Sequence, residues 1–183
     1  RKYTSAMLVA AGNSTRMGLP FSKQFIPLCG MYAIEHTIRA FQKCDKIDEI
    51  VIVARSEDIE SIGANAFQGS SKLTILNLPP CLEVIGDNAF QNCSNLQKIW
   101  LPASLTKIGS KAFAGCYNLT RIYTESFATI EDADAFSTYG KAILFVPTGA
   151  LATINEKAGW RDFTRKYEGY YEGESPESVE RSY

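Results

Sequence analysis

A 23-residue pattern occurs three times between Glu60 and Ala128 and then begins a fourth time, which restricts the folds open to this chain. The copies read "ESIGANAFQGSSKLTILNLPPCL", "EVIGDNAFQNCSNLQKIWLPASL" and "TKIGSKAFAGCYNLTRIYTESFA". When aligned, they place three residue types in register: Gly63, Gly86 and Gly109; Phe67, Phe90 and Phe113; Leu73, Leu96 and Leu119. Such a period predicts a solenoid, because one unit is too small to bury its own apolar side and must stack on its neighbours.

Each position of the repeat has an expected role. The glycine is expected to allow a turn with positive φ, and the phenylalanine to fill the core once per turn. The apolar residues Leu96, Ile99 and Leu101 predict a short strand. Cys93 and Cys116 lie one period apart, and we interpret them as buried apolar fillers, since five cysteines without close pairs argue against a disulfide framework.

Written as L-x-x-I-x-L-P-x-x-L-x-x-I-G-x-x-A-F-x-x-C, the pattern resembles the BspA-like leucine-rich repeats of bacterial surface proteins over residues 60–163. The resemblance implies a solenoid with a face that binds a protein or a glycan. On that face we expect the polar residues Asn77, Gln97, Lys98, Thr120 and Arg121. The degraded fourth unit ends in Gly159 and Trp160, which resemble the family's terminal cap, and Trp160 is expected to plug the core there.

The first 59 residues follow a different pattern. Ser5–Ala10 and Glu49–Ala54 are short apolar runs typical of buried strands. Between them, apolar residues at helical spacing from Met31 to Phe41 predict an amphipathic helix. The segment therefore predicts a strand, loop, helix and strand, a βαβ unit with a right-handed crossover. Such a unit is too small to form a core of its own.

The loop "AGNSTRMG", with "SKQF" after it, resembles the opening segment of the 2-C-methyl-D-erythritol 4-phosphate cytidylyltransferase family over residues 5–59. The resemblance implies that the loop backbone cradles the triphosphate of CTP, that Arg16 and Lys23 stabilise charge as catalytic residues, and that Mg²⁺ assists. The nucleotide-binding residues that it implies are Ala10, Ala11, Gly12, Asn13, Ser14, Thr15, Arg16, Met17, Gly18 and Lys23.

This second resemblance departs from its family in two ways. Ser14 stands where the family usually has glycine, and Ser22 where it usually has proline. The resemblance also stops near Glu60, before the acidic metal ligands and the rest of the sheet. We therefore expect a leucine-rich repeat interaction module that carries an incomplete CTP-binding-like fragment, is not catalytic and needs no cofactor. The alternative is a cytidylyltransferase that transfers CMP from CTP to 2-C-methyl-D-erythritol 4-phosphate in isoprenoid biosynthesis.

The predicted fold class is α/β, with three parts. Residues 1–59 form a strand-loop-helix-strand fragment of a nucleotidyltransferase-like parallel sheet. Residues 60–163 form a leucine-rich repeat solenoid with its cap, and residues 164–183 form an acidic, frayed tail. No Gly, Ser or Pro linker separates the first two parts, so we expect them to abut, with Ile59 and Ile62 buried at the seam.

Composition limits the partners. The formal net charge is -1, which gives no overall positive field for nucleic acid. No apolar run approaches the roughly 18 residues of a membrane span. One histidine, His36, and no CxxC motif make a metal site unexpected. We therefore expect a protein or a glycan on the solenoid face, and weak binding of CTP at the loop. The two resemblances imply different locations, the cytoplasm for the enzyme and the cell surface for the repeats.

Overall fold

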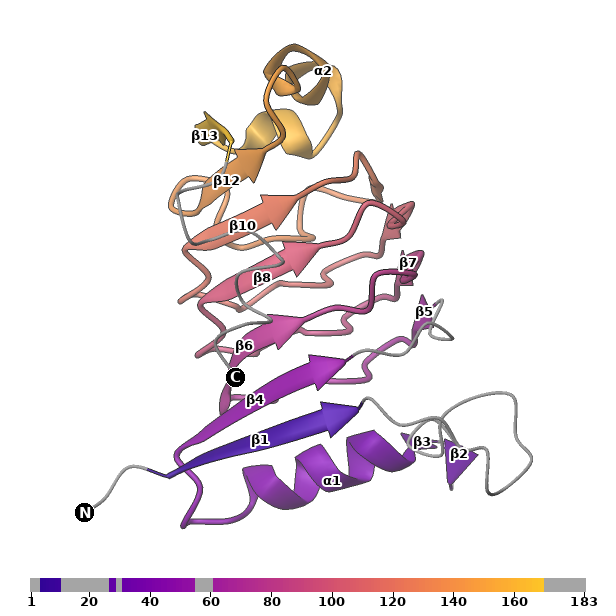
Figure 1. Ribbon diagram of the computed structural model, residues 1–183, viewed down its shortest axis with the longest axis vertical. Coiled ribbons are helices and arrows are strands. Elements are labelled where there is room, and N and C mark those ends of the chain that lie inside the picture. The colour runs from indigo at the N-terminus through magenta and orange to yellow at the C-terminus, as the bar shows by residue number, and fades with distance from the viewer. Residues whose placement is uncertain (1–3, 11–26, 29–30, 55–60, 170–183) are drawn as a thin grey trace.

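A long parallel sheet runs through almost the whole molecule. The computed structural model describes residues 4–10, 27–28, 31–54 and 61–169 (Figure 1). Its seven-stranded sheet has the neighbours, in spatial order, β1 (Ser5–Ala10), β4 (Glu49–Ala54), β6 (Leu73–Asn77), β8 (Lys98–Leu101), β10 (Arg121–Thr124), β12 (Ile143–Val146) and β13 (Arg165–Glu168). Every neighbouring pair is parallel. This confirms a parallel-sheet solenoid built from the repeats.

A short second sheet lies on another side of the solenoid. It contains β5 (Ser61–Ile62), β7 (Val84–Ile85), β9 (Lys107–Ile108) and β11 (Thr129–Ile130), also all parallel. The remaining described elements are β2 (Pro27–Leu28), antiparallel to β3 (Met31–Tyr32), and the helices α1 (Ala33–Gln42), α2 (Leu151–Glu156) and the 3₁₀ helix η3 (Trp160–Asp162).

The repeated phenylalanines form one continuous stack inside the solenoid, as the sequence predicts. The ring centroids of Phe67, Phe90, Phe113 and Phe136 are 5.0, 5.2 and 4.9 Å apart, and the rings are nearly parallel. Cys93 and Cys116 are fully buried, and the Sγ of Cys116 donates to the carbonyl oxygen of Phe90 at 3.1 Å. The hydrogen bond with Cys116 and burial both raise the pKa of Cys93, so its thiol stays protonated inside the core. Both cysteines are fillers, as predicted.

The repeated glycines do not have the positive φ that the sequence analysis predicts, and their structural role is a different one. Gly63, Gly86 and Gly109 do not have positive φ. A Cβ on Gly109 would lie 2.7 Å from the backbone nitrogen of Asp87, and one on Gly86 would lie 2.7 Å from that of Ala64. The glycines are needed because successive turns approach each other closely here. The left-handed positions lie two residues further on, at Asn65 (φ 61°), Asn88 (φ 56°) and Lys111 (φ 53°).

The N-terminal strand-helix-strand unit continues the sheet of the repeats. The predicted strands and helix are present as β1, α1 and β4, and β1 and β4 are parallel neighbours. β4 pairs in turn with β6, and the N–H of Ile50 donates to the carbonyl of Lys72 at 2.8 Å. Ile38 of α1 and Ile50 belong to the same buried core as Leu73. At the predicted seam, Ile62 is half-buried against this core, while Ile59 lies outside the described residues.

The end of the solenoid is closed by a cap. Trp160 is fully buried, and its Nε1–H donates to the carbonyl of Ala128 at 2.7 Å, which confirms the predicted plug. The structure differs from the predicted acidic tail at residues 165–168, which form β13 beside β12. The stretch Arg165–Glu168 is polar and shows little apolar alternation, but a strand at the edge of a sheet needs only its backbone to pair. Residues 170–183 lie outside the described residues.

Candidate functional site

Most of the predicted nucleotide-binding loop lies outside the described residues. Ala11 to Gly18, including Arg16, and also Lys23 lie outside the described residues. Ala10 is the last residue of β1, so the loop leaves the sheet at the carboxyl end of that strand.

Aromatic side chains form a row on the outer face of the long sheet. Side chains alternate along a strand, so Ile99 points into the core while Trp100 points outward. The register aligns Trp100 with Tyr123, Tyr123 with Phe145, and Phe145 with Tyr167. The ring centroids of these pairs are 4.6, 4.6 and 6.1 Å apart, and all three pairs are stacked. We call these four residues the aromatic ladder.

A second column, two residues earlier on the same strands, carries positive charge. Lys98 is aligned with Arg121, Arg121 with Ile143, and Ile143 with Arg165. The Nζ of Lys98 lies 5.0 Å from the centre of the Trp100 ring, within the range of a cation–π contact. We call Lys98, Arg121 and Arg165 the cation column. The two columns together give this face an apolar row beside a positively charged row.

Most of the aromatic ladder is buried although it lies on an outer face. Trp100, Tyr123 and Phe145 are 8%, 1% and 2% exposed, whereas Tyr167 is 51% exposed. The three buried rings form a cluster separate from the solenoid core. The Nε1–H of Trp100 is buried and has no hydrogen-bond partner within the described part of the chain. A buried indole N–H normally has an acceptor, so Trp100 departs from the usual pattern.

The predicted polar face coincides with this one. Gln97, Thr120 and Arg121 are exposed and Lys98 is half-exposed, while the side chain of Asn77 lies outside the description. The sequence reasoning missed the aromatic ladder beside them. The signal is present, because "KIWL", "RIYT", "ILFV" and "RKYE" place an aromatic residue at the third position of each strand. Successive side chains of a strand point to opposite faces, so Trp100 and Tyr123 point outward when Ile99 and Ile122 point into the core.

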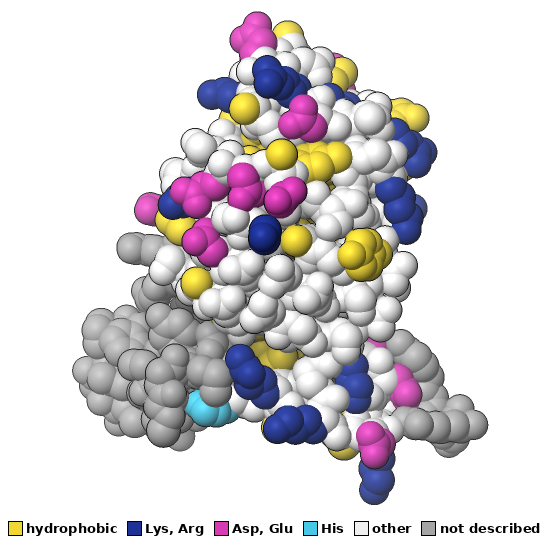
Figure 2. Space-filling model, turned by 180° about the vertical axis from the view of Figure 1, so that it is seen from behind, with side chains coloured by type: hydrophobic (Ala, Val, Ile, Leu, Met, Phe, Trp, Pro, Cys, Tyr) yellow, Lys and Arg dark blue, Asp and Glu magenta, His cyan; other side chains and the backbone are white. Residues whose placement is uncertain are grey.

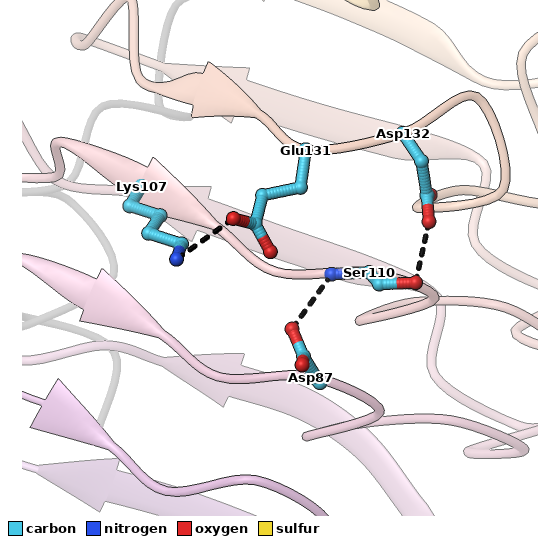
Figure 3. Close-up of polar contacts among 5 residues, drawn as sticks. All are labelled: Asp87, Lys107, Ser110, Glu131 and Asp132. Carbon is cyan, nitrogen blue, oxygen red and sulfur yellow. Dashed lines mark hydrogen bonds and ion pairs between the residues drawn. The ribbon is translucent and has the colours of Figure 1, made fainter.

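A polar cluster on the other side of the solenoid links successive turns (Figure 3). Its members are Asp87, Lys107, Ser110, Glu131 and Asp132. The backbone N–H of Ser110 donates to Asp87 Oδ1 at 2.9 Å, and its hydroxyl bonds to Asp132. Lys107 pairs with Glu131 at 2.8 Å, and this hydrogen bond and charge raise the pKa of Lys107. These groups satisfy one another, so the cluster has a structural explanation.

The surface around this cluster is open. Figure 2, which shows the molecule from behind, has acidic side chains gathered near its middle. A depression of about 510 Å³ spans three successive turns and is lined by residues that include Asn92, Lys111, Tyr117 and Asp134. Within the described ranges, no three His, Cys, Asp or Glu side chains are placed to hold a metal ion. Among these same residues, no helix is both long and apolar enough to cross a membrane.

Comparisons with known proteins confirm both resemblances. A family model described as "BspA type Leucine rich repeat region" matches residues 34–158 in six copies. A solved leucine-rich repeat protein from Bacteroides ovatus ATCC 8483 is 25% identical, with a TM-score of 0.34, over 44% of this chain and 26% of that chain.

Among curated proteins, the 2-C-methyl-D-erythritol 4-phosphate cytidylyltransferase of Alkaliphilus oremlandii is 40% identical over 57 residues, which are 31% of this chain and 24% of that protein. The bifunctional ribulose 5-phosphate reductase/CDP-ribitol pyrophosphorylase Bcs1 of Haemophilus influenzae is 44% identical over 61 residues, covering 30% of this chain and 13% of that protein. The chain thus spans about a quarter or less of the length of these two relatives.

Proposed function

The chain belongs to the BspA-type leucine-rich repeat family, and from that premise we propose that it is a binding module that holds a protein partner on the outer face of its long sheet. Stacked repeats offer extended surfaces of this kind to partners. The observation that carries the proposal is the pairing of the aromatic ladder with the cation column in one register. No catalytic step is assigned to this face.

The chemistry of the face selects an acidic partner. Tyr167, the exposed ring at the end of the aromatic ladder, offers an apolar surface that loses little conformational entropy on binding. Lys98, Arg121 and Arg165 favour carboxylates beside this ladder, and the two arginines can bind a carboxylate through two hydrogen bonds. The buried N–H of Trp100 requires an acceptor. We therefore propose an extended, acidic protein segment that also carries aromatic residues.

A defined polymer tests this proposal. Fluorescent poly(Glu,Tyr) should bind the chain, and Arg121→Glu should weaken that binding about tenfold, because it replaces attraction with repulsion at the centre of the cation column. Fluorescence anisotropy measures the affinity, and a comparison of two salt concentrations gives the electrostatic contribution to it. Lys157→Glu makes the same charge change at an exposed site on the cap and should leave the affinity within about twofold. Equal losses for both variants would contradict the proposal.

A second function is favoured by the N-terminal relatives. The loop follows β1 at the carboxyl end of a parallel strand, where open α/β sheets commonly bind ligands. Together with the 40% identity to a cytidylyltransferase, this supports weak binding of CTP with Mg²⁺ by the loop, without transfer. Such binding would use Arg16 and Lys23, while the cytidylyltransferase activity itself belongs to proteins about four times as long as the matched segment.

Titration calorimetry with CTP and Mg²⁺ tests this second proposal. The expected result is a measurable heat that Arg16→Ala and Lys23→Ala each reduce. Lys46→Ala, an exposed cation on the turn before β4, provides the matched control. Absence of heat with the unaltered chain would rule out nucleotide binding, and equal heats in all four proteins would rule out the assigned residues.

A further inference from the structure

The third copy of the repeat departs from the first two copies at two positions of one turn. The first two copies have glutamine and serine there, in "FQGSS" and "FQNCS", whereas the third has Ala114 and Tyr117, in "FAGCY". Stacking does not explain this departure, because it accepts the residues of the other copies. Departures from an otherwise consistent pattern commonly mark functional sites.

Both replacements line the depression of about 510 Å³ that spans three successive turns. Ala114 and the neighbouring Gly115 are the smallest residues of its lining, so they leave space between the turns on either side. We propose that this depression binds a short neutral oligosaccharide, which stacks on Tyr117. The polar side chains of the lining come from all three turns and belong to Gln91, Asn92, Lys111, Asp134 and Ser137.

Hydrogen bonds between the turns hold the depression in one shape. The N–H of Asn92 donates to the carbonyl of Ala114 at 2.7 Å. The N–H of Gly115 donates to Ser137 Oγ at 2.8 Å. Gly115 has φ 76°, and a Cβ at this position would clash with the side-chain oxygen of Asn92, so a larger residue does not fit there. A site that is already formed loses less entropy when it binds a ligand.

Tyr117 gives the depression an exposed aromatic ring. The residue is 65% exposed, and the Nζ of Lys141 on the next turn donates to its backbone carbonyl at 2.8 Å. The face of an aromatic ring carries partial negative charge, and the C–H groups on one face of a sugar ring are partially positive, so the two faces attract each other. An exposed tyrosine beside polar groups therefore suits a sugar, which presents C–H groups on its faces and hydroxyl groups at its edge.

The polar side chains beside the ring suit those hydroxyl groups. The side-chain oxygen of Gln91 accepts a hydrogen bond from Nε2 of Gln68, so the amide N–H groups of Gln91 are left as donors. Asp134, exposed on the following turn, offers two carboxylate oxygens, which bind hydroxyl groups through short, strong hydrogen bonds. A sugar hydroxyl both donates and accepts, so it can use both kinds of partner.

Charge and volume favour a neutral oligosaccharide. Lys111 and Asp134 are the charged residues of the lining, and their charges cancel. The volume of about 510 Å³ lies within the range of small-molecule sites, on the order of 300–1,000 Å³, and suits two or three sugar rings. A free amino acid also matches one cation and one carboxylate, and it is the competing ligand that the experiment excludes.

Saturation-transfer NMR tests the site with three neutral trisaccharides: maltotriose, cellotriose and N,N′,N″-triacetylchitotriose. At least one should receive saturation on its ring C–H protons, with a Kd of roughly 1 mM. Ala114→Gln should weaken this binding at least about tenfold, because it fills the depression with the glutamine that the first two copies carry and that the fold already accepts. No transfer to any of the three, or equal transfer to the Ala114→Gln variant, would overturn the inference.

Variants of the exposed rings test the stacking platform. Tyr117→Ala should weaken binding about tenfold, whereas Tyr117→Phe keeps the ring and should stay within about threefold. Phe127, between β10 and β11, is 37% exposed and lies outside the lining of the depression. Phe127→Ala therefore provides the matched control and should leave the affinity within about twofold. Equal losses for Tyr117→Ala and Phe127→Ala would also overturn the inference.

Competition separates this site from the proposed function, on which the inference does not rest. An excess of poly(Glu,Tyr) should leave the saturation transfer to the trisaccharide unchanged, and so should an excess of glycine. Displacement by the polymer would place the sugar on the long sheet, displacement by glycine would assign the depression to amino acids, and either result would overturn the inference. A trisaccharide that binds through Tyr117, in a chain that does not bind the polymer, would support the inference and contradict the proposed function alone.

Discussion

Equivalent glycines of neighbouring repeats differ in what surrounds them. A Cβ on Gly109 would meet the backbone of Gly86 and Asp87 at 2.7 Å, because a turn lies directly beneath it. Gly63 lies in the first turn and has no atom within 4 Å of the same position. Neither residue has a left-handed backbone. The repeat pattern alone would treat the two as identical.

Alanine at these two positions should therefore have opposite effects. Gly109→Ala should lower the free energy of unfolding by about 1–3 kcal/mol, since backbone atoms must move apart to admit the methyl group. Gly63→Ala should leave it unchanged or raise it by up to about 1 kcal/mol, because the unfolded chain loses entropy. Urea denaturation of both variants measures the difference. Similar losses for both would show that the close approach of the turns is not the constraint.

One left-handed position has an unfavourable residue. Lys111 has φ 53°, whereas its equivalents in the two preceding repeats are asparagines, which adopt this conformation more readily. Lys111→Asn should raise the free energy of unfolding by about 1 kcal/mol. The comparison is Lys157→Asn, at an exposed position with φ −85°, which should give no gain. A lower free energy of unfolding for Lys111→Asn would mean that the lysine side chain stabilises the fold by more than its left-handed backbone destabilises it.

At the scale of elements, the two tryptophans distinguish the cap from the outer face. Trp160 fills the end of the core and bonds to Ala128, whereas the N–H of Trp100 has no partner in the described ranges. Trp160→Phe should lower the free energy of unfolding by about 1–3 kcal/mol, because the carbonyl of Ala128 loses its donor. Trp100→Phe should cost less, and thermal denaturation of the two variants compares them. An equal or larger cost at Trp100 would contradict this assignment.

The inward-facing parts of each element could be predicted from the sequence. The phenylalanine stack, the two buried cysteines and the Trp160 plug all follow from a period of 23 residues, because a stacked repeat puts equivalent side chains on top of each other. β13 could not be predicted in this way. Arg165–Glu168 has no apolar pattern, and its pairing depends on β12 offering an edge.

At the scale of the whole molecule, two unrelated sequence patterns form one sheet. The boundary between residues 59 and 60 is sharp in sequence, yet β4 pairs with β6 as β6 pairs with β8. The sequence predicts that the two parts abut, but it does not predict that they share one sheet. Pairing between strands far apart in the chain is a long-range contact that no local pattern specifies. The nucleotide loop stays a prediction from resemblance.

Hydrogen exchange tests the continuity of the sheet. The amide of Ile50 donates to Lys72, across the boundary, as the amide of Ile143 donates to Thr120 within the repeats. The two amides should exchange at rates within about tenfold of each other, because both open with the same sheet. Mass spectrometry of peptides from β4 and β12 measures these rates. Exchange of β4 at the rate of an unprotected chain would show that the N-terminal unit is a separate, loosely attached part.

The proposed binding surface is the outer face of the long sheet. The most direct test follows the two indole N–H resonances by ¹H–¹⁵N NMR during titration with poly(Glu,Tyr). We expect the Trp100 resonance to shift as its N–H meets a new environment, together with the amides of Lys98 and Arg121. The resonance of Trp160, which is bonded to Ala128, should not shift. Shifts confined to β7 and β9 on the other sheet, with Trp100 unchanged, would contradict it.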